Sequence, residues 1–430
     1  MNPLRKTGII PALLAAVWML TCLAGCSDAE EIGTVQFVES YPSGTPLDLA
    51  DLEEAAIVWP RVIDSTNHSF RVASFYYSRI GDGQDAGAPA DTPDLMAPIL
   101  DKLAAAAGRG VQVQLLADSK FHKTYPDVPD WLGTVDGAES RILDADGHWG
   151  GVLHAKYFLS DDDLLFVGSQ NWDWRALDQI HELGVLVKHT RLAADLGRIF
   201  DMDWELAGTD APVGVQAGEI SSHEQPGLFE LPGATVVTAH GDTVIALLAA
   251  SPVIALPEGI PWDLPLLVEM IDTARDSVHL QLLSYGVTDR EKILFDDLDR
   301  ALRRASVRGA KVRIILSNWS KSSYKLPWIK SLAVLPNVEI RFTNIPEYSG
   351  GFIPFARVEH AKYLTVDGHT LWIGTSNWSR GYFHQSRNIS LFFRGPGSTR
   401  DPDRFFNLSW HGPYAETVDP AAEYSPPKRN

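Results

Sequence analysis

The chain has 430 residues, of which 45% are hydrophobic and 21% are charged, an ordinary composition for a globular protein of two or three domains. Its formal net charge of -18 argues against non-specific coating of nucleic acid, because such binding depends on many contacts between basic side chains and phosphates. Its two cysteines, Cys22 and Cys26, both lie near the N-terminus, which excludes a disulfide framework or a cysteine metal site in the rest of the chain.

Residues 1–25 have the pattern of a lipoprotein signal peptide. Arg5 and Lys6 precede an apolar run that ends in Leu23-Ala-Gly-Cys26 and is short for a membrane span. This ending resembles a bacterial lipobox, whose cysteine is lipidated after cleavage; a plain secretory signal is the alternative. We therefore expect a protein of the bacterial cell envelope, anchored through Cys26 in the outer membrane and facing the periplasm, with residues 26–35 as a tether.

Strands and helices alternate through the rest of the chain. The first elements are a helix-like stretch interrupted by Pro60, a strand, a helix and a second strand, at 48–64, 70–77, 95–107 and 111–116. The later part repeats this order, with a helix predicted at 293–308 and a strand at 311–316. Alternation of this kind indicates an α/β fold, and the repeat indicates a duplicated domain. The predicted parts are an N-terminal half, a linker, a C-terminal half and a loose tail, at 36–207, 208–233, 234–412 and 413–430.

One motif occurs twice at identical spacing. Its copies contain His154, Lys156, Asp161, Ser169 and Asn171, and His360, Lys362, Asp367, Thr375 and Asn377. Each copy predicts a β-hairpin in which the His and Lys, two residues apart, point to one face of a strand. The Asp lies at the turn and is interpreted as structural, and the Asn follows the returning strand.

The residue types of the motif suit chemistry at a phosphate. Lysine supplies positive charge and an Asn amide donates to a phosphate oxygen, whereas histidine serves as nucleophile, acid or base near neutral pH. Two copies allow one histidine to attack phosphorus while the other protonates the leaving oxygen. This chemistry requires no metal and no cofactor, and the acidic run 161–163 is interpreted as a solvated turn and not as a calcium loop.

The paired motifs resemble the phospholipase D superfamily, in which two such halves meet at a pseudo-twofold axis around one active site. Flanking segments at 150–154, 171–175 and 356–360 resemble the branch that contains lysosomal 5′ exonucleases and poxvirus envelope and nicking proteins. The resemblance implies an α/β/α phosphodiesterase that acts through a phosphohistidine. It favours a nuclease on single-stranded DNA or RNA, and a homodimer. A phospholipase D or phosphatidyltransferase acting on phospholipid, and a non-catalytic envelope scaffold, remain as alternatives.

The two halves differ at one position. Glu182 lies eleven residues after Asn171, whereas Asn388 lies eleven residues after Asn377. By the resemblance, Glu182 orients His360 and Asn388 lies near His154. A carboxylate stabilises an imidazolium better than an amide does, so the histidines are expected to differ in role. Relatives favour His154 as the nucleophile.

Three further sets of residues have weaker predictions. The aromatic residues after the motifs are interpreted as core or as base-stacking side chains: Trp172, Trp174, Trp378, Tyr382 and Phe383. Four basic residues are interpreted as surface charges or as a basic rim: Arg175, Arg380, Lys321 and Lys325. Four histidines without a predicted partner are interpreted as surface or structural: His122, His148, His181 and His384.

Overall fold

The computed structural model describes residues 31–82, 88–208, 225–289 and 292–429. From Ile32 onward the chain forms one compact unit. The predicted signal peptide, Cys26 and most of the predicted linker lie outside the described residues. Within the described ranges, no helix has the length and apolar character needed to cross a membrane.

The first half of the chain, from β1 to α7, forms a mixed sheet. Its strands are β1 (Ile32–Ser40), β3 (Ser69–Ser74), β5 (Gln112–Asp118), β6 (Ala138–Leu143), β7 (Lys156–Ser160), β8 (Leu164–Gly168) and β10 (Glu182–Lys188). Their order is β6-β5-β3-β7-β8-β10-β1, with β6, β5 and β3 parallel and the other neighbours antiparallel. The short strand β2 (Glu53–Glu54) adds to it by pairing with β1, whereas β4 (Tyr77–Ser78) and β9 (Trp172–Asp173) form a separate two-stranded sheet.

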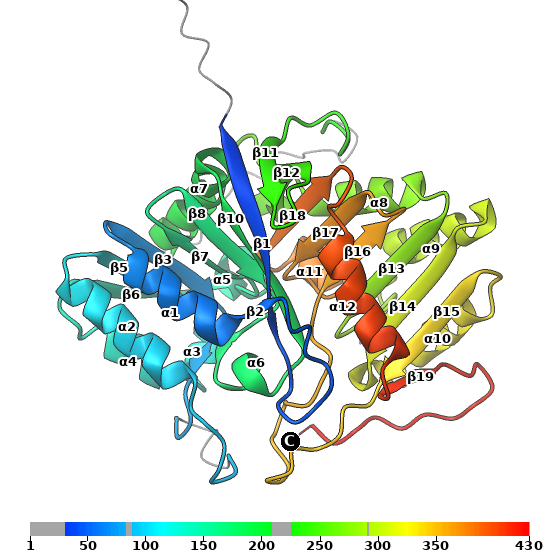
Figure 1. Ribbon diagram of the computed structural model, residues 1–430, viewed down its shortest axis with the longest axis horizontal. Helices are drawn as coiled ribbons and strands as arrows, with labels where there is room; N and C mark the ends of the chain where they lie inside the picture. Colours follow the sequence, from blue (N-terminus) through cyan, green and yellow to red (C-terminus); the bar gives the residue numbers. More distant parts are fainter. Residues whose placement is uncertain (1–30, 83–87, 209–224, 290–291, 430) are drawn as a thin grey trace, which may run out of the picture. The chain divides into compact units, whose positions relative to one another are not determined.

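The second half, from β11 to the C-terminus, repeats this sheet. Its strands are β11 (Ala234–Thr238), β12 (Thr243–Ser251), β13 (Ser277–Leu282), β14 (Lys311–Ser317), β15 (Val338–Thr343), β16 (Tyr363–Val366), β17 (Thr370–Gly374), β18 (Asn388–Arg394) and β19 (Ala415–Thr417). The order β15-β14-β13-β16-β17-β18-β12 matches the first half strand for strand. Because β11 pairs with both β12 and β1, the two half-sheets join in one sheet, which contains 17 of the described strands (Figure 1).

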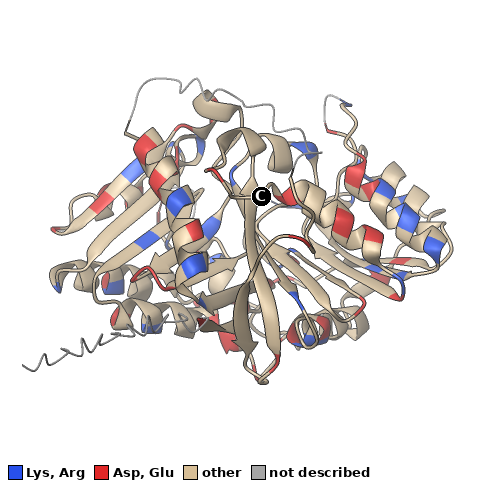
Figure 2. Ribbon diagram, turned by 90° about the horizontal axis from the view of Figure 1, so that it is seen from above, with Lys and Arg blue, Asp and Glu red and all other residues tan. Residues whose placement is uncertain are grey.

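Helices cover both faces of this sheet and define three hydrophobic cores. The longer ones are α1 (Ala55–Ser65), α2 (Met96–Gly108), α7 (Thr190–Leu206), α8 (Asp263–Thr273), α9 (Asp297–Arg308), α10 (Leu326–Ala333) and α12 (Arg400–His411). The short ones are α3 (Ser119–His122), α4 (Asp127–Leu132), α5 (Ala145–Trp149), α6 (Arg175–Asp178), α11 (Arg380–His384), η2 (Val253–Ala255) and η3 (Asn318–Ser320). One outer core contains α1 and α2, the other contains α8 and α9, and the central core contains α7, α12 and strands of both halves. The predicted α/β fold with two duplicated halves is confirmed. Lys, Arg, Asp and Glu are interspersed along the helices that face outward (Figure 2).

Three element boundaries differ from the sequence prediction. Pro60 lies inside α1 and does not interrupt it, since the helix buries Val58, Trp59, Val62 and Ile63 in the outer core. Residues 32–35, predicted as tether, belong to β1 because they pair with β10 and β11. The helix predicted from residue 293 begins at Asp297. The backbone N–H of Phe295 donates to Val287 O (2.7 Å), and this bond keeps Phe295 outside the helix.

The prediction of a loose C-terminal tail is wrong. Residues 415–417 form β19, which pairs antiparallel with β15 at the edge of the sheet. Beyond it, the ring of Tyr424 packs edge-on against Phe342 (5.3 Å between centroids), and Lys330 donates to Ala422 O (2.6 Å). The segment has few apolar residues at the spacing of a strand. Its sequence therefore gives no sign that it pairs with the edge of an existing sheet.

The hairpins predicted from the two motifs are present. Asp161 and Asp367 begin their turns with φ of 50° and 52°, a left-handed conformation that Asp tolerates better than most residues. The carboxylate of Asp161 accepts backbone N–H bonds from Asn67, His68 and Ser69 (2.7 to 3.1 Å). The carboxylate of Asp367 accepts the same set from Arg275, Asp276 and Ser277 (2.7 to 2.8 Å). Asp161 therefore links its hairpin to the loop before β3, and Asp367 links its hairpin to the loop before β13.

Replacing Asp161 with alanine is expected to lower the free energy of unfolding by about 2 kcal/mol, since it removes a charged acceptor from three backbone donors. Burial opposes ionisation, but the backbone donors prevail and lower the pKa of Asp161. This contribution is therefore present above the ordinary carboxyl pKa and is lost as the pH falls through the lower, folded value. Urea unfolding at pH 7 and at pH 3 measures both effects. Asp161→Asn, which keeps the turn conformation, is expected to lose less.

Candidate active site

The motif histidines lie just before their strands, where the two halves of the chain pair with each other. The sequence predicted a strand from residue 152, whereas β7 begins at Lys156. The equivalent strand of the second half, β16, begins at Tyr363. The preceding segments instead form parallel bridges across the halves, Leu153 with Arg387 and His181 with Glu359. A Cβ on Gly151 would lie 1.6 Å from the carbonyl oxygen of Gln385, so a side chain at this position would push the halves apart.

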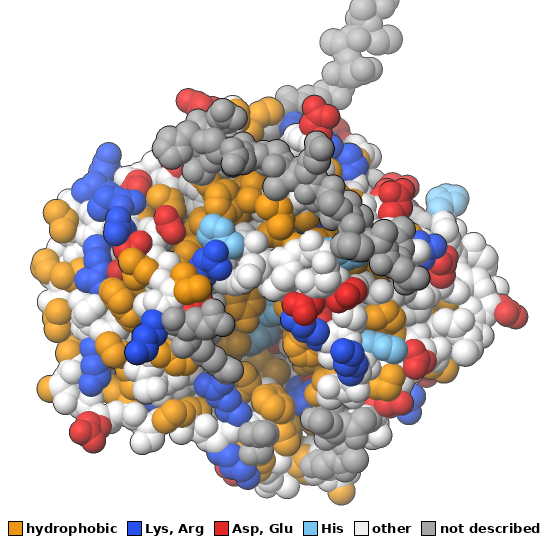
Figure 3. All heavy atoms as spheres, turned by 180° about the vertical axis from the view of Figure 1, so that it is seen from behind, with side chains coloured by type: hydrophobic (Ala, Val, Ile, Leu, Met, Phe, Trp, Pro, Cys, Tyr) orange, Lys and Arg blue, Asp and Glu red, His pale blue; other side chains and the backbone are white. Residues whose placement is uncertain are grey.

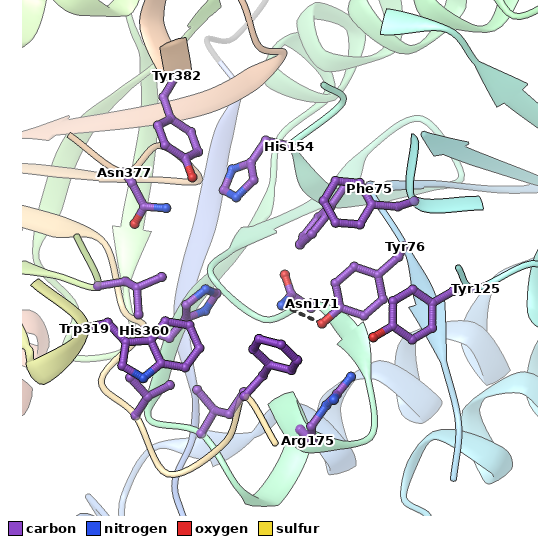
Figure 4. Close-up of a pocket in the computed structure, with 15 residues that line it drawn as sticks. Phe75, Tyr76, Tyr125, His154, Asn171, Arg175, Trp319, His360, Asn377 and Tyr382 are labelled. Carbon is purple, nitrogen blue, oxygen red and sulfur yellow. Dashed lines mark hydrogen bonds between the residues drawn. The ribbon is translucent and has the colours of Figure 1, made fainter. Parts of the chain in front are cut away.

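A cavity of about 240 Å³ opens where the halves meet. It is lined by Phe75, Tyr76, Phe121, Tyr125, His154, Asn171, Arg175, Ile180, Leu283, Trp319, Phe355, Val358, His360, Asn377 and Tyr382. The structure thus brings together the predicted His and Asn residues of both motifs, which point into one space (Figure 4). In the view from behind, hydrophobic and histidine side chains lie in a hollow near the middle of the face, with basic side chains around it (Figure 3).

His154 is held in a single tautomer by Asn388. The amide nitrogen of Asn388 donates to the carbonyl oxygens of Tyr382 (2.8 Å) and Ser386 (3.3 Å), which fixes the orientation of the amide. Its Oδ1 therefore faces Nδ1 of His154 at 3.1 Å and accepts a hydrogen bond from the Nδ1–H group. The Nε2 of neutral His154 is left with a free lone pair. The imidazole lies between the rings of Phe75 and Tyr382, with centroids 5.1 and 4.7 Å away.

His360 is held by a carboxylate. Both oxygens of Glu182 lie close to Nδ1 of His360, at 2.9 and 2.7 Å, and the Glu182 side chain is fully buried. The contacts that the family resemblance implied for Glu182 and Asn388 are thus both present, each reaching across to the histidine of the other half. A carboxylate at this distance stabilises an imidazolium, which the amide at His154 does not do.

Lys156 and Lys362 lie behind the histidines and are fully buried. The ammonium group of each donates to the backbone carbonyl of the histidine two residues before it. Burial, followed by the charges of Lys156 and Lys362, lowers the pKa of His154 well below its usual value, and the same causes lower the pKa of His360. Burial also lowers the pKa of Lys362 to about 7, although Glu182 and Glu359 act in the opposite direction. A bound phosphodiester anion would favour the protonated forms of Lys156 and Lys362.

The remaining motif residues support the site from outside the cavity. Thr375 Oγ1 donates to Oδ1 of Asn388 (2.9 Å) and accepts from Ile389 N (3.1 Å). Ser169 Oγ accepts from Leu183 N (3.1 Å) at the equivalent place in the first half. Asp161 and Asp367 lie at the hairpin turns, outside the cavity lining.

Sequence reasoning missed the aromatic lining of the cavity. On the side of the first half, Tyr76 is stacked between Phe121 and Tyr125, with centroids 6.0 and 4.7 Å away. On the side of the second half, Trp319 meets Phe355 edge-on at 6.2 Å. The proposed alternative that the tryptophans after the motifs stack bases is wrong for Trp172, Trp174 and Trp378, which are buried in the outer cores. Of that set, Tyr382 does line the cavity, whereas Phe383 is buried.

Tyr76 also belongs to a polar network. Its hydroxyl accepts from Nδ2 of Asn171 (3.2 Å; dashed in Figure 4) and donates to Asp173 (2.5 Å). Asp173 forms a buried ion pair with Arg175 (2.7 Å). Arg175 belongs to the predicted basic rim and lines the cavity, and its charge is therefore balanced by Asp173. From the sequence, Phe75 and Tyr76 were expected only as part of a strand at 70–77, with no role in the site.

Comparison with known proteins identifies the family. The family model described as "Cardiolipin synthase, PLD-like domain" matches residues 61–204 and 267–410, one copy in each half. The chain belongs to the phospholipase D superfamily. It is therefore a phosphodiesterase of that superfamily, as its two motifs predicted.

Relatives of the superfamily match almost the whole chain. The rat "5'-3' exonuclease PLD3" is 30% identical over 406 residues, covering 90% of this chain and 81% of its own. The "virion nicking-joining enzyme" of vaccinia virus (strain Western Reserve) is 29% identical over 405 residues, covering 91% and 90%. The crystal structure of phosphatidylserine synthase from Haemophilus influenzae has the same fold, with a TM-score of 0.57, 12% identity, and coverage of 90% and 87%.

The described residues contain no group of three or more His, Cys, Asp or Glu side chains placed to hold a metal ion. The polar groups that line the cavity are imidazoles, amides, tyrosine hydroxyls and a guanidinium, with the ammonium groups of Lys156 and Lys362 buried behind them. Such groups suit an anionic ligand.

Proposed function

We propose that this phospholipase D superfamily protein is a metal-independent nuclease that cleaves single-stranded DNA or RNA through a phosphohistidine. The observation that carries the choice of nucleic acid is the aromatic lining around the two histidines, with Tyr76 and Tyr125 on one side and Trp319 and Phe355 on the other. Base stacking on such side chains contributes about 1–3 kcal/mol per base, irrespective of sequence. Relatives named as an exonuclease and a nicking-joining enzyme support the same choice.

In the proposed mechanism, Nε2 of His154 attacks phosphorus and the bond to the leaving oxygen breaks. His360, protonated beside Glu182, gives its Nε2 proton to that oxygen. Neutral His360 then takes a proton from water, whose oxygen attacks the phosphohistidine and releases His154. Lys156, Lys362, Asn171 and Asn377 would stabilise the charge on the phosphate oxygens.

The test uses purified residues 27–430 in EDTA, with single-stranded oligonucleotides labelled at either end, and separately with phosphatidylglycerol plus an alcohol. The proposal expects cleavage of the oligonucleotide without added metal. Cleavage or transfer on the lipid alone would replace the nuclease proposal with a phosphatidyltransferase. Loss of all activity in EDTA would contradict the mechanism. The His154→Ala variant is the control for contaminating nucleases.

The charge of Lys362 predicts a pH dependence. Since its pKa is about 7, Lys362 is protonated below that pH and loses its charge above it. We expect kcat/KM for the oligonucleotide to fall as the pH rises above about 7, because a neutral lysine no longer attracts the phosphate. A pH profile at constant ionic strength measures this, with Lys362→Arg expected to flatten the fall. An activity that rises between pH 7 and 9 would contradict the assignment.

The stacking role predicts a separate effect at Tyr125, which lines the cavity and stacks on Tyr76. Tyr125→Ala is expected to raise KM for a single-stranded oligonucleotide about 10-fold, corresponding to loss of about 1.4 kcal/mol of stacking. Tyr125→Phe keeps the ring and should stay near wild type. Equal KM values for the two variants would remove the stacking argument.

We also propose that the mature protein is anchored in the cell envelope through a lipidated Cys26 and forms a homodimer. The support for the anchor is the lipobox-like sequence. Mass spectrometry of the mature N-terminus, with Cys26→Ala as the control, tests the anchor, and sedimentation of residues 27–430 tests the dimer. A soluble product cut elsewhere, or a monomer at micromolar concentration, would contradict the respective proposal.

A further inference from the structure

A second histidine–carboxylate pair crosses between the halves, next to the pair formed by Glu182 and His360. Nδ1 of His181 lies 2.9 Å from Oε2 of Glu359, and both side chains are fully buried. His181 directly precedes Glu182, and Glu359 directly precedes His360. The two pairs therefore lie at neighbouring residues of the same two segments, which pair with each other between the halves.

The backbone of this bridge fixes the position of His360. His181 N donates to Val358 O (3.0 Å), and the carbonyl oxygen of His181 accepts from the N–H groups of His360 (2.9 Å) and Ala361 (3.1 Å). Neighbouring side chains in extended backbone point to opposite sides. His360 thus lines the cavity while the imidazole of His181 packs on Phe405 of α12, with 4.2 Å between centroids and 14° between planes.

The surroundings of His181 show which of its ring nitrogens donates. Nδ1 faces the carboxylate of Glu359 and is the donor, while Nε2 has no hydrogen-bond partner among the described residues. A second N–H group on this ring would find no acceptor in the core, which is costly. The carboxylate of Glu359, after that of Glu182, raises the pKa of Lys362 against the effect of burial.

The equivalent bridge in the other half is built differently. There Leu153 pairs with Arg387, and the Arg387 guanidinium forms a buried ion pair (2.7 Å) with Asp203 of α7. Leu153 supplies no polar group, so the side chains of that bridge do not bind each other. Only the bridge at His360 carries a hydrogen bond between its own two side chains.

We propose that His181 and Glu359 are positioning residues, which hold the Glu182 carboxylate on Nδ1 of His360 while His360 loses and regains its proton. The inference rests on the proposed two-histidine mechanism. Their hydrogen bond fixes the two segments against each other one residue away from the catalytic pair. The carboxylate of Glu359 also raises the pKa of Lys362, which is buried behind the cavity.

The test is Glu359→Gln, which keeps the shape of the side chain and one acceptor but removes the charge. We expect kcat to fall about 10- to 100-fold, KM to change less than about 3-fold, and the alkaline fall in kcat/KM to move to lower pH. Asp203→Asn is the matched control in the other half. It is expected to destabilise the protein without moving the pH profile.

A second readout does not depend on turnover. In ¹⁵N-histidine NMR spectra, the Nδ1 proton of His360, hydrogen-bonded to Glu182, is expected to shift or broaden in Glu359→Gln and to stay unchanged in Asp203→Asn. Wild-type kcat, pH profile and His360 resonance in Glu359→Gln would overturn the inference. A loss of activity that is fully explained by a smaller folded fraction, as measured by thermal unfolding, would also overturn the inference. If wild-type protein cleaves neither oligonucleotide nor lipid, the proposed function fails, whereas the NMR comparison still decides the positioning role.

Discussion

Substituting alanine for His154 is expected to reduce phosphodiester cleavage by at least about 10³-fold, because the variant has no nucleophile that can reach phosphorus. Lys156, Lys362 and the two Asn residues stay in place, so KM should change little. The same substitution at His360 removes the proton donor. The His360→Ala variant is expected to lose as much cleavage activity on an oligonucleotide as His154→Ala does, because the leaving oxygen is strongly basic.

The leaving group distinguishes the two histidines. With a nitrophenyl phosphodiester, whose leaving oxygen needs no proton, His360→Ala should form the phosphohistidine at a near-normal rate and then stall. His154→Ala should remain inactive on both substrates. Stopped-flow release of nitrophenol measures the burst. A burst in His154→Ala and none in His360→Ala would reverse the assignment and make His360 the nucleophile.

Replacing Glu182 with glutamine is expected to lower kcat by about 10²- to 10⁴-fold with little change in KM. The amide fills the same buried space but does not stabilise the imidazolium that His360 must form, and it can favour the wrong tautomer. Steady-state kinetics with oligonucleotide in EDTA measure the loss, and circular dichroism checks folding. A kcat within 3-fold of wild type would show that Glu182 has no such role.

The matched change in the other half is Asn388→Asp, which places a carboxylate 3.1 Å from Nδ1 of His154. A negative charge there should raise the pKa of His154 and keep it protonated at a pH where the wild-type residue is neutral. The pH optimum is therefore expected to move upward, since attack requires the neutral form. An unchanged optimum would mean that the difference between Glu182 and Asn388 does not assign the roles.

The repeated motif made the duplicated fold and the cluster of His, Lys and Asn side chains predictable. Its fixed spacing specifies two equal hairpins, and the pattern of strands and helices around each copy is local. The contacts of Glu182 and Asn388 came from resemblance, because no local pattern shows which half each side chain faces.

The cavity walls were not predictable in the same way. Phe75, Tyr125 and Phe355 lie in separate loops and Trp319 lies in η3, and only the tertiary fold brings them to one space. The tail was missed for a related reason, since β19 forms by pairing with an edge that already exists. His181 had no visible partner because Glu359 lies 178 positions away, across the interface. Long-range contacts of this kind leave no periodic signal in the sequence.

The central claim is that the two halves form one metal-free site in which His154 carries the phosphoryl group. Its most direct test is to mix wild-type protein with excess oligonucleotide in EDTA, quench within milliseconds in strong base, and map the adduct by mass spectrometry. A phosphoryl adduct is expected on His154 that survives base and is lost in acid. With a nitrophenyl phosphodiester in place of the oligonucleotide, the amount of this adduct is expected to rise in His360→Ala. An adduct on another residue, or turnover without any adduct, would contradict it.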